Sequence, residues 1–113
     1  MKTKFYLFRQ INSGGFFLRD KQLGVDAQML IEAYDEDQAL DIFQRIGDSY
    51  GEDDFRQYCD CCGYRWDFEV NDQYEVIPDW VFSDGSTSII MLSGKIIRVR
   101  QDEKEETLTF RDS

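Results

Sequence analysis

The sequence predicts an α+β fold in which one helix, at about residues 35–46, packs on a mostly antiparallel β-sheet. Short segments rich in aromatic and β-branched residues recur along the chain, as expected for strands. One segment carries its apolar residues at helical spacing. The chain has 113 residues, one proline and no low-complexity tract, which indicates a single domain over residues 1–113.

The first third of the chain predicts three strands. Residues 4–10 are rich in aromatic side chains and predict the first strand. The Asn-Ser-Gly-Gly run at 12–15 predicts a turn, since Asn and Gly tolerate positive φ. Residues 16–19 then return as the second strand of a hairpin, and residues 28–33 form the third strand.

The helix prediction depends on its cap and its apolar stripe. Asp35 can cap the helix, and Gln38 three residues later completes a capping box. Gly47 is expected to end the helix. The residues of the apolar stripe are Ala39, Ile42, Phe43 and Ile46.

The second half of the chain predicts further strands. Residues 64–70 alternate apolar with polar side chains, which is typical of a half-buried strand that ends at Asn71 and Asp72. Residues 74–77 predict a short strand stopped by Pro78. Residues 88–92 and 95–100 predict a late hairpin around Ser93 and Gly94, and residues 107–110 predict a last strand.

The net charge of −10 is concentrated in the middle of the chain. Residues 26–85 contain seventeen acidic side chains and three arginines, whereas residues 1–25 contain five basic side chains and one acidic. This charge opposes direct binding to a phosphate backbone, so nucleic-acid binding is not expected, and it favours a partner with a basic surface. A solvated surface that keeps the protein soluble is the commoner explanation of such charge, and imitation of nucleic-acid phosphates is a further alternative. The candidate partner-binding residues are Asp35, Glu36, Asp37, Asp41, Asp48, Glu52, Asp53 and Asp54.

Three cysteines form one cluster, at Cys59, Cys61 and Cys62. A Cys-x-x-Cys-Gly segment resembles half of a zinc site, but the sequence has no second such pair and no histidine. Zinc could be completed by a carboxylate or by a second subunit, which would make a homodimer. Buried packing next to a tight turn is the alternative with more weight, and no cofactor is expected beyond this zinc candidate.

No catalytic site is predicted, because the sequence has no histidine and no base placed beside a nucleophile. No apolar run is long enough to span a membrane, and the N-terminal residues lack the apolar core of a signal peptide, so a cytoplasmic protein is expected. An alternative to protein binding is a nucleotide or oligonucleotide module built on the early basic and aromatic hairpin. Its aromatic residues are Phe5, Phe8, Phe16 and Phe17, with Trp66 and Phe68 further along the chain, and its basic residues are Lys2, Lys4, Arg9, Arg19 and Lys21.

Four segments carry a resemblance to a family. They read FYLFRQ at 5–10, NSGG at 12–15, IEA at 31–33 and CDCCGYRW at 59–66. Over residues 4–70 the chain resembles small uncharacterised proteins of tailed bacteriophages, and residues 72–113 are then a lineage-specific β extension. The resemblance implies a phage protein that acts in the cytoplasm of a bacterial host. It also implies a non-catalytic role in host takeover or counter-defence, by binding and modulating or inhibiting a host or defence protein.

Overall fold

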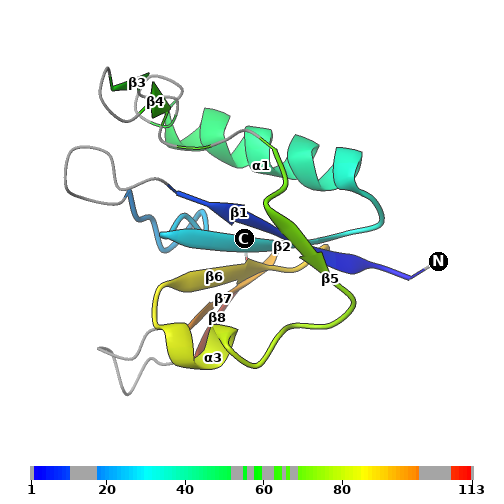
Figure 1. Cartoon of the computed structure of the whole chain (residues 1–113). Helices are drawn as coiled ribbons and strands as arrows, with labels where there is room; N and C mark the ends of the chain where they lie inside the picture. The colour runs from blue at the N-terminus through cyan, green and yellow to red at the C-terminus, as the bar shows by residue number, and fades with distance from the viewer. Residues whose placement is uncertain are drawn as a thin grey trace.

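The computed structural model describes residues 2–10, 18–51, 55, 58–59, 63–64, 66, 69–99 and 108–112. These residues form a mostly antiparallel six-stranded sheet in the order β5-β1-β2-β6-β7-β8, with a long helix on one face and a short helix on the other (Figure 1). The predicted α+β class is confirmed. The strands of the sheet are β1 (Lys4–Arg9), β2 (Gln28–Ala33), β5 (Asp72–Tyr74), β6 (Thr87–Ile90), β7 (Lys95–Val99) and β8 (Leu108–Asp112). The helices are α1 (Glu36–Tyr50) and α3 (Val81–Asp84), and a separate hairpin contains β3 (Tyr58–Cys59) and β4 (Gly63–Tyr64).

One pair of neighbouring strands in the sheet is parallel. β1 pairs with β2 and with β5 in antiparallel register, whereas β2 pairs with β6 in parallel, with Leu30 opposite Ile89. The β6–β7 and β7–β8 pairs are antiparallel, so the predicted late hairpin and last strand are confirmed. Residues 72–113, expected as an extension, therefore supply four of the six strands.

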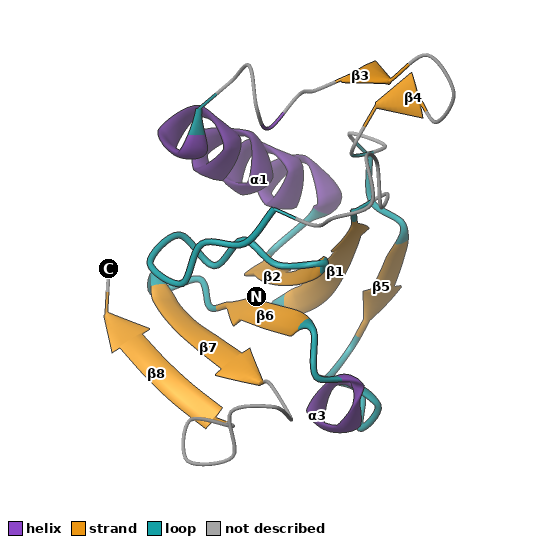
Figure 2. Ribbon diagram, turned by 90° about the vertical axis from the view of Figure 1, so that its left-hand side faces the viewer, coloured by secondary structure: helices purple, strands orange, loops and turns teal. Residues whose placement is uncertain are grey.

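Alternation along the strands divides the core between the two faces of the sheet. Phe8, Met29, Ile31, Ile90 and Ile96 face α1. On the other face a smaller cluster surrounds α3, and its buried residues are Phe5, Leu7, Leu30, Val81 and Ile89. Figure 2 shows α1 above β1 and β2, on the face of the sheet opposite α3. Leu18, Leu23 and Val25 from the segment before β2 belong to the cluster on the α1 face.

Stacked aromatic rings hold α1 on the sheet. The ring of Phe43 stacks on Phe8 with 4.3 Å between ring centroids, and it meets the edge of Trp66 at 5.0 Å. Phe55 stacks on Trp66 at 5.1 Å. These four rings are buried, so the predicted apolar face of the helix is confirmed at its centre.

The prediction that Gly47 ends the helix is wrong. α1 continues to Tyr50, and the backbone N–H of Gly51 closes the last turn on the carbonyl of Gly47. Gly47 is required for a different reason. A Cβ at this position would lie 2.5 Å from Cδ2 of Phe55, so the glycine makes room for that ring.

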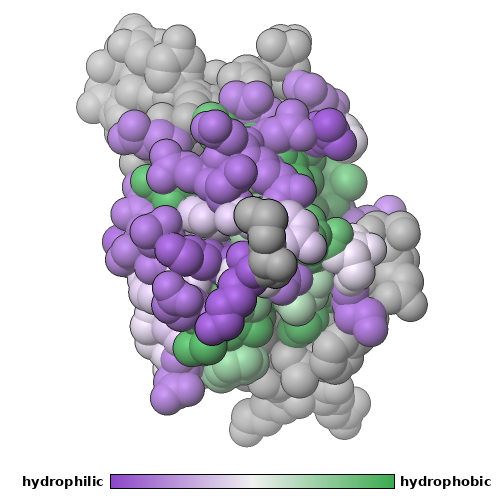
Figure 3. All heavy atoms as spheres, turned by 90° about the vertical axis from the view of Figure 1, so that its right-hand side faces the viewer, coloured by the Kyte–Doolittle hydropathy of each residue, from purple (hydrophilic) through white to green (hydrophobic). Residues whose placement is uncertain are grey.

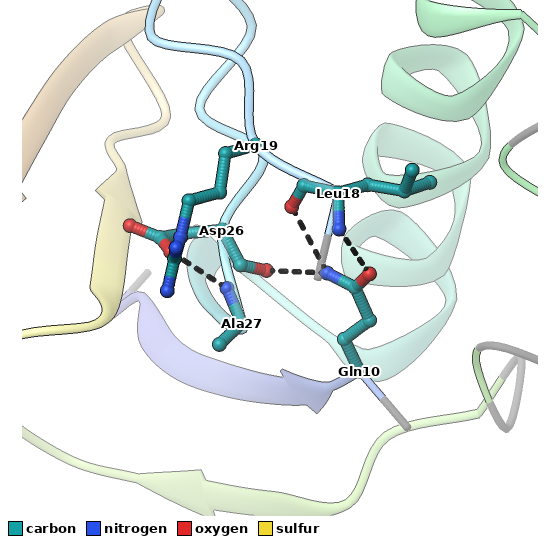
Figure 4. A network of polar contacts seen from close by, with 5 residues as sticks. All are labelled: Gln10, Leu18, Arg19, Asp26 and Ala27. Carbon is teal, nitrogen blue, oxygen red and sulfur yellow. Dashed lines mark hydrogen bonds and ion pairs between the residues drawn. The ribbon is translucent and has the colours of Figure 1, made fainter. Parts of the chain in front are cut away.

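The prediction of a hairpin strand at residues 16–19 is wrong for its described part. Residues 11–17 lie outside the described residues, and Leu18 and Arg19 are not in a strand. The buried side chain of Gln10 takes the place of a strand partner: its Oε1 accepts from the Leu18 N–H at 2.6 Å, and its Nε2 donates to the carbonyls of Leu18 and Asp26 (Figure 4). β1 instead pairs along its length with β2.

The segment around Trp66 also differs from the prediction of a strand at residues 64–70. Trp66 makes an isolated bridge with Gln10, and Glu69 and Val70 are not in a strand. Asn71 and Asp72 do not end a strand: Asn71 lies directly before β5, where its N–H donates to the carbonyl of Leu7 and its side chain accepts from the N–H of Arg9, and Asp72 is the first residue of β5. β5 consequently covers residues 72–74 instead of the expected 74–77.

Candidate partner-binding surface

The predicted acidic residues that the structure describes all belong to α1 or its cap. Asp35 caps the helix, Glu36 and Asp37 lie in its first turn, and Asp41 and Asp48 follow along it; all five are exposed. The other three predicted residues, Glu52, Asp53 and Asp54, lie outside the described residues. The described candidates are therefore brought together on one element.

Part of this charge stabilises the helix itself. The carboxylate of Asp35 accepts from the N–H of Gln38 at 2.8 Å, which confirms the predicted cap. The side chain of Gln38 accepts in return from the N–H of Tyr34, one residue earlier than in a standard capping box. Glu36 and Asp37 meet the positive end of the helix dipole.

Asp37, Asp41 and Asp48 form a row along the outward face of α1, called here the acidic row. At 3.6 residues per turn, positions four and eleven residues after the first return to nearly the same face of a helix. At 1.5 Å per residue, the three positions lie about 6 Å and then about 10 Å apart along the helix axis. Arg45 borders the row and pairs with Asp41 at 2.9 Å. Within the described residues, Asp37 and Asp48 make no ion pair.

The acidic row lies on a firmly packed helix. Ala39, Phe43 and Gly47 on the opposite side of α1 are buried against the sheet. Carboxylates that project from such an element keep their spacing without a partner, which lowers the entropy lost on binding.

The carboxylates at the N-terminal end of α1 add to the negative electrostatic potential of this surface. Burial raises the pKa of the Tyr6 hydroxyl above its ordinary value of 10.0, and the carboxylates of Asp35, Glu36 and Glu75 raise it further. Figure 3, which looks toward this end of the helix, shows hydrophilic side chains gathered over the part of the molecule where α1 lies. Glu75 also meets Lys4 at 3.7 Å, but both groups are partly exposed and the pair is screened by water.

A cavity of about 430 Å³, called here the flank cavity, lies beside the acidic row. The sequence interpretation missed it; Ile42 and Ile46, at the edge of the apolar stripe, are the signal that could have indicated it. Its wall is mostly apolar, and polar atoms stand at its rim. The apolar lining residues are Leu23, Ile42, Ile46, Ile90 and Ile96, and the others are Gln22, Arg45, Ser49 and Gly94.

Cys59 of the cysteine cluster is in β3, which lies with β4 on the same side of the sheet as α1 (Figure 1). The backbone of Cys59 in β3 pairs with Gly63 in β4. The side chain of Cys59, together with Cys61 and Cys62, lies outside the described residues, so zinc binding stays a prediction. Among the residues that are described, no three His, Cys, Asp or Glu side chains form a metal-binding group.

The early aromatic residues belong to the core as far as they are described. Phe5, Phe8 and Trp66 are buried and have no face free for a base. Phe16, Phe17 and Phe68 lie outside the described residues. Of the basic side chains, Arg19 donates to the buried carboxylate of Asp26 at 3.0 Å and Lys4 meets Glu75, while Lys2, Arg9 and Lys21 are exposed.

The fold and this surface define a small α+β domain with an acidic helix over one face of its sheet. The chain belongs to the family described as a domain of unknown function (DUF7296), whose profile matches residues 3–105. This match includes residues 72–105, a segment that the resemblance to phage proteins over residues 4–70 does not cover. No curated protein matches the chain. No solved structure matches it either. Across the described residues, no helix is long and apolar enough to span a membrane.

Proposed function

We propose that this protein is a non-catalytic binding protein whose acidic row engages a basic surface on another protein. The observation that carries the proposal is the arrangement of exposed carboxylates on one packed helix, two of them without an ion pair within the described residues. An arrangement of this kind attracts a basic partner over a long range at low ionic strength.

The resemblance of residues 4–70 to tailed-bacteriophage proteins supports a host or defence protein as the partner, met in the cytoplasm of an infected bacterium. Inhibition or modulation of that partner follows from occupation of its basic surface. If the basic surface is one that binds DNA or RNA, the acidic row takes the place of phosphates.

The test is affinity capture from bacterial lysate with three forms of the protein. The first is the wild type, and the second neutralises the acidic row by Asp37→Asn, Asp41→Asn and Asp48→Asn. The third is a control with the same change in net charge away from α1, made at exposed positions by Glu69→Gln, Asp72→Asn and Asp79→Asn.

The proposal expects a specific protein that the wild type and the control retain and that the neutralised row loses. Raising the salt concentration should release it, because exposed charges are screened beyond the Debye length. A partner retained equally by all three forms would overturn the proposal. Equal loss from both variants would also overturn it, since net charge rather than the row would then be responsible.

A further inference from the structure

We infer that the partner places one large apolar side chain in the flank cavity, with basic residues on either side of it that reach the acidic row. This inference rests on the proposed function and specifies the chemistry of the segment that binds.

The flank cavity has the size and lining of a binding pocket. Its volume of about 430 Å³ falls within the range of about 300–1,000 Å³ that is usual for ligand sites. Ile42 and Ile46 from α1 form one wall, and Ile90 and Ile96 from β6 and β7 form the other. Such a space accepts an aliphatic or aromatic side chain, because most of its lining is apolar.

The flank cavity and the acidic row are adjacent on α1. Successive helix residues are separated by about 100°, so Ile42, Ile46 and Ser49 share one flank and the acidic row occupies the next. Arg45 stands between them, since it both lines the cavity and pairs with Asp41. A partner segment that covers the cavity therefore also passes the row.

The charged side chains of α1 beside the cavity favour one class of apolar ligand over another. An anionic amphipath such as a fatty acid would meet Arg45 at the lining of the cavity, but that guanidinium is paired with Asp41 at 2.9 Å, and Asp37 and Asp48 stand on the same side of α1 as Asp41. A basic segment meets attraction from the same carboxylates. One buried apolar anchor surrounded by charged contacts is also the usual arrangement at the centre of a protein interface.

The isoleucine methyl groups make this arrangement measurable. Ile42, Ile46, Ile90 and Ile96 line the flank cavity, whereas Ile89 and Ile97 belong to the cluster on the α3 face of the sheet. Methyl-labelled protein can be titrated in an NMR experiment with the capped peptide Lys-Lys-Trp-Lys-Lys. The control peptides are Lys-Lys-Ala-Lys-Lys, which lacks the anchor, and Glu-Glu-Trp-Glu-Glu, which reverses the charge.

The inference expects ring-current shifts from the tryptophan peptide at the four cavity methyls and not at Ile89 or Ile97. The alanine and glutamate peptides should shift the cavity methyls little. It is overturned if the tryptophan peptide leaves the four methyls unchanged at its solubility limit, or if the glutamate peptide shifts them equally.

A variant that closes the cavity separates this inference from the proposed function. Ser49 is exposed at the rim, so Ser49→Trp can fill the space from outside, and Ser49→Ala keeps it open. Ser49→Trp should abolish the peptide-induced shifts and weaken binding of the captured partner by about 10- to 30-fold, as for loss of a central anchor, and Ser49→Ala should do neither. If neutralising the acidic row abolishes binding and Ser49→Trp does not change it, the inference fails and the proposed function stands. If neither variant weakens binding, both fail.

Discussion

Replacement of Gly47 by alanine tests how α1 packs against the aromatic core. Gly47 lies inside the helix with its α-carbon facing the ring of Phe55. An added Cβ would lie 2.5 Å from Cδ2 and 2.8 Å from Cε2 of that ring, where ordinary contact begins at 3.4 Å. The ring must therefore shift by about 1 Å to accept one methyl group.

Two opposing effects set the size of the change. Alanine inside a helix is more favourable than glycine by about 1 kcal/mol. Overpacking a core costs about 1–3 kcal/mol. The Phe55 ring stacks on Trp66 at 5.1 Å and meets Phe43 at 5.2 Å, so its shift disturbs three rings and the cost falls in the upper part of that range. We expect Gly47→Ala to lower the free energy of unfolding by about 1–2 kcal/mol.

Urea denaturation followed by tryptophan fluorescence measures this change, since Trp66 is buried in the affected cluster. Ser49→Ala is the matched control, because it changes helix propensity at an exposed position and should stabilise the protein by a few tenths of a kcal/mol. Gly47→Ala should then be repeated in a Phe55→Leu background, which removes the ring and keeps an apolar side chain. In that background Gly47→Ala should become stabilising, by up to about 1 kcal/mol.

The reversal of sign is the decisive outcome. A wild-type protein stabilised by Gly47→Ala would refute the reasoning, because it would mean that the ring yields at no cost. Equal destabilisation in both backgrounds would refute it too, since the effect would then come from something other than Phe55.

Three further predictions concern the cap, the buried tyrosine and the cysteines. Asp35→Ala should cost about 1 kcal/mol in urea denaturation, because the N–H of Gln38 loses its acceptor, and an unchanged midpoint would contradict the cap. The raised pKa of Tyr6 means that the folded state holds the hydroxyl proton more tightly than the unfolded state. The protonated hydroxyl therefore contributes fully to stability below the ordinary pKa of 10.0, and this contribution falls as the pH rises through the pKa of the folded state. As the pH rises above about 10, Tyr6→Phe should therefore lose less stability than the wild type, and parallel losses would exclude Tyr6 as a cause. Elemental analysis of protein purified without chelator should find zinc if Cys59, Cys61 and Cys62 bind it, and a zinc content near zero would remove that hypothesis.

The elements that could be predicted from the sequence are those with local signals. The cap at Asp35, the stripe that contains Phe43 and the late hairpin depend on neighbours within a few residues, and the structure has all three. The extent of α1 could not be predicted, because the reason for Gly47 is the ring of Phe55, which reaches it through the tertiary fold.

Contacts that leave no local sequence pattern account for other features that could not be predicted. The parallel pairing of β2 with β6 joins residues almost sixty positions apart and leaves no local pattern. Likewise, the Gln10 side chain satisfies the backbone around Leu18, where the sequence indicated a strand. For the surface, composition indicated the carboxylates of α1. Ile42 and Ile46 are a signal for only one wall of the flank cavity, because the other wall comes from β6 and β7 through the tertiary fold.

The affinity of the captured partner at two ionic strengths tests the central claim most directly. Calorimetric titrations at about 0.1 M and about 1 M salt change the Debye length from about 10 Å to about 3 Å. The wild type and the control with Glu69→Gln, Asp72→Asn and Asp79→Asn should bind tightly at low salt and much more weakly at high salt. The form with Asp37→Asn, Asp41→Asn and Asp48→Asn should bind weakly at both. An affinity that this form retains at low salt, with the same salt dependence as the wild type, would contradict the role of the acidic row.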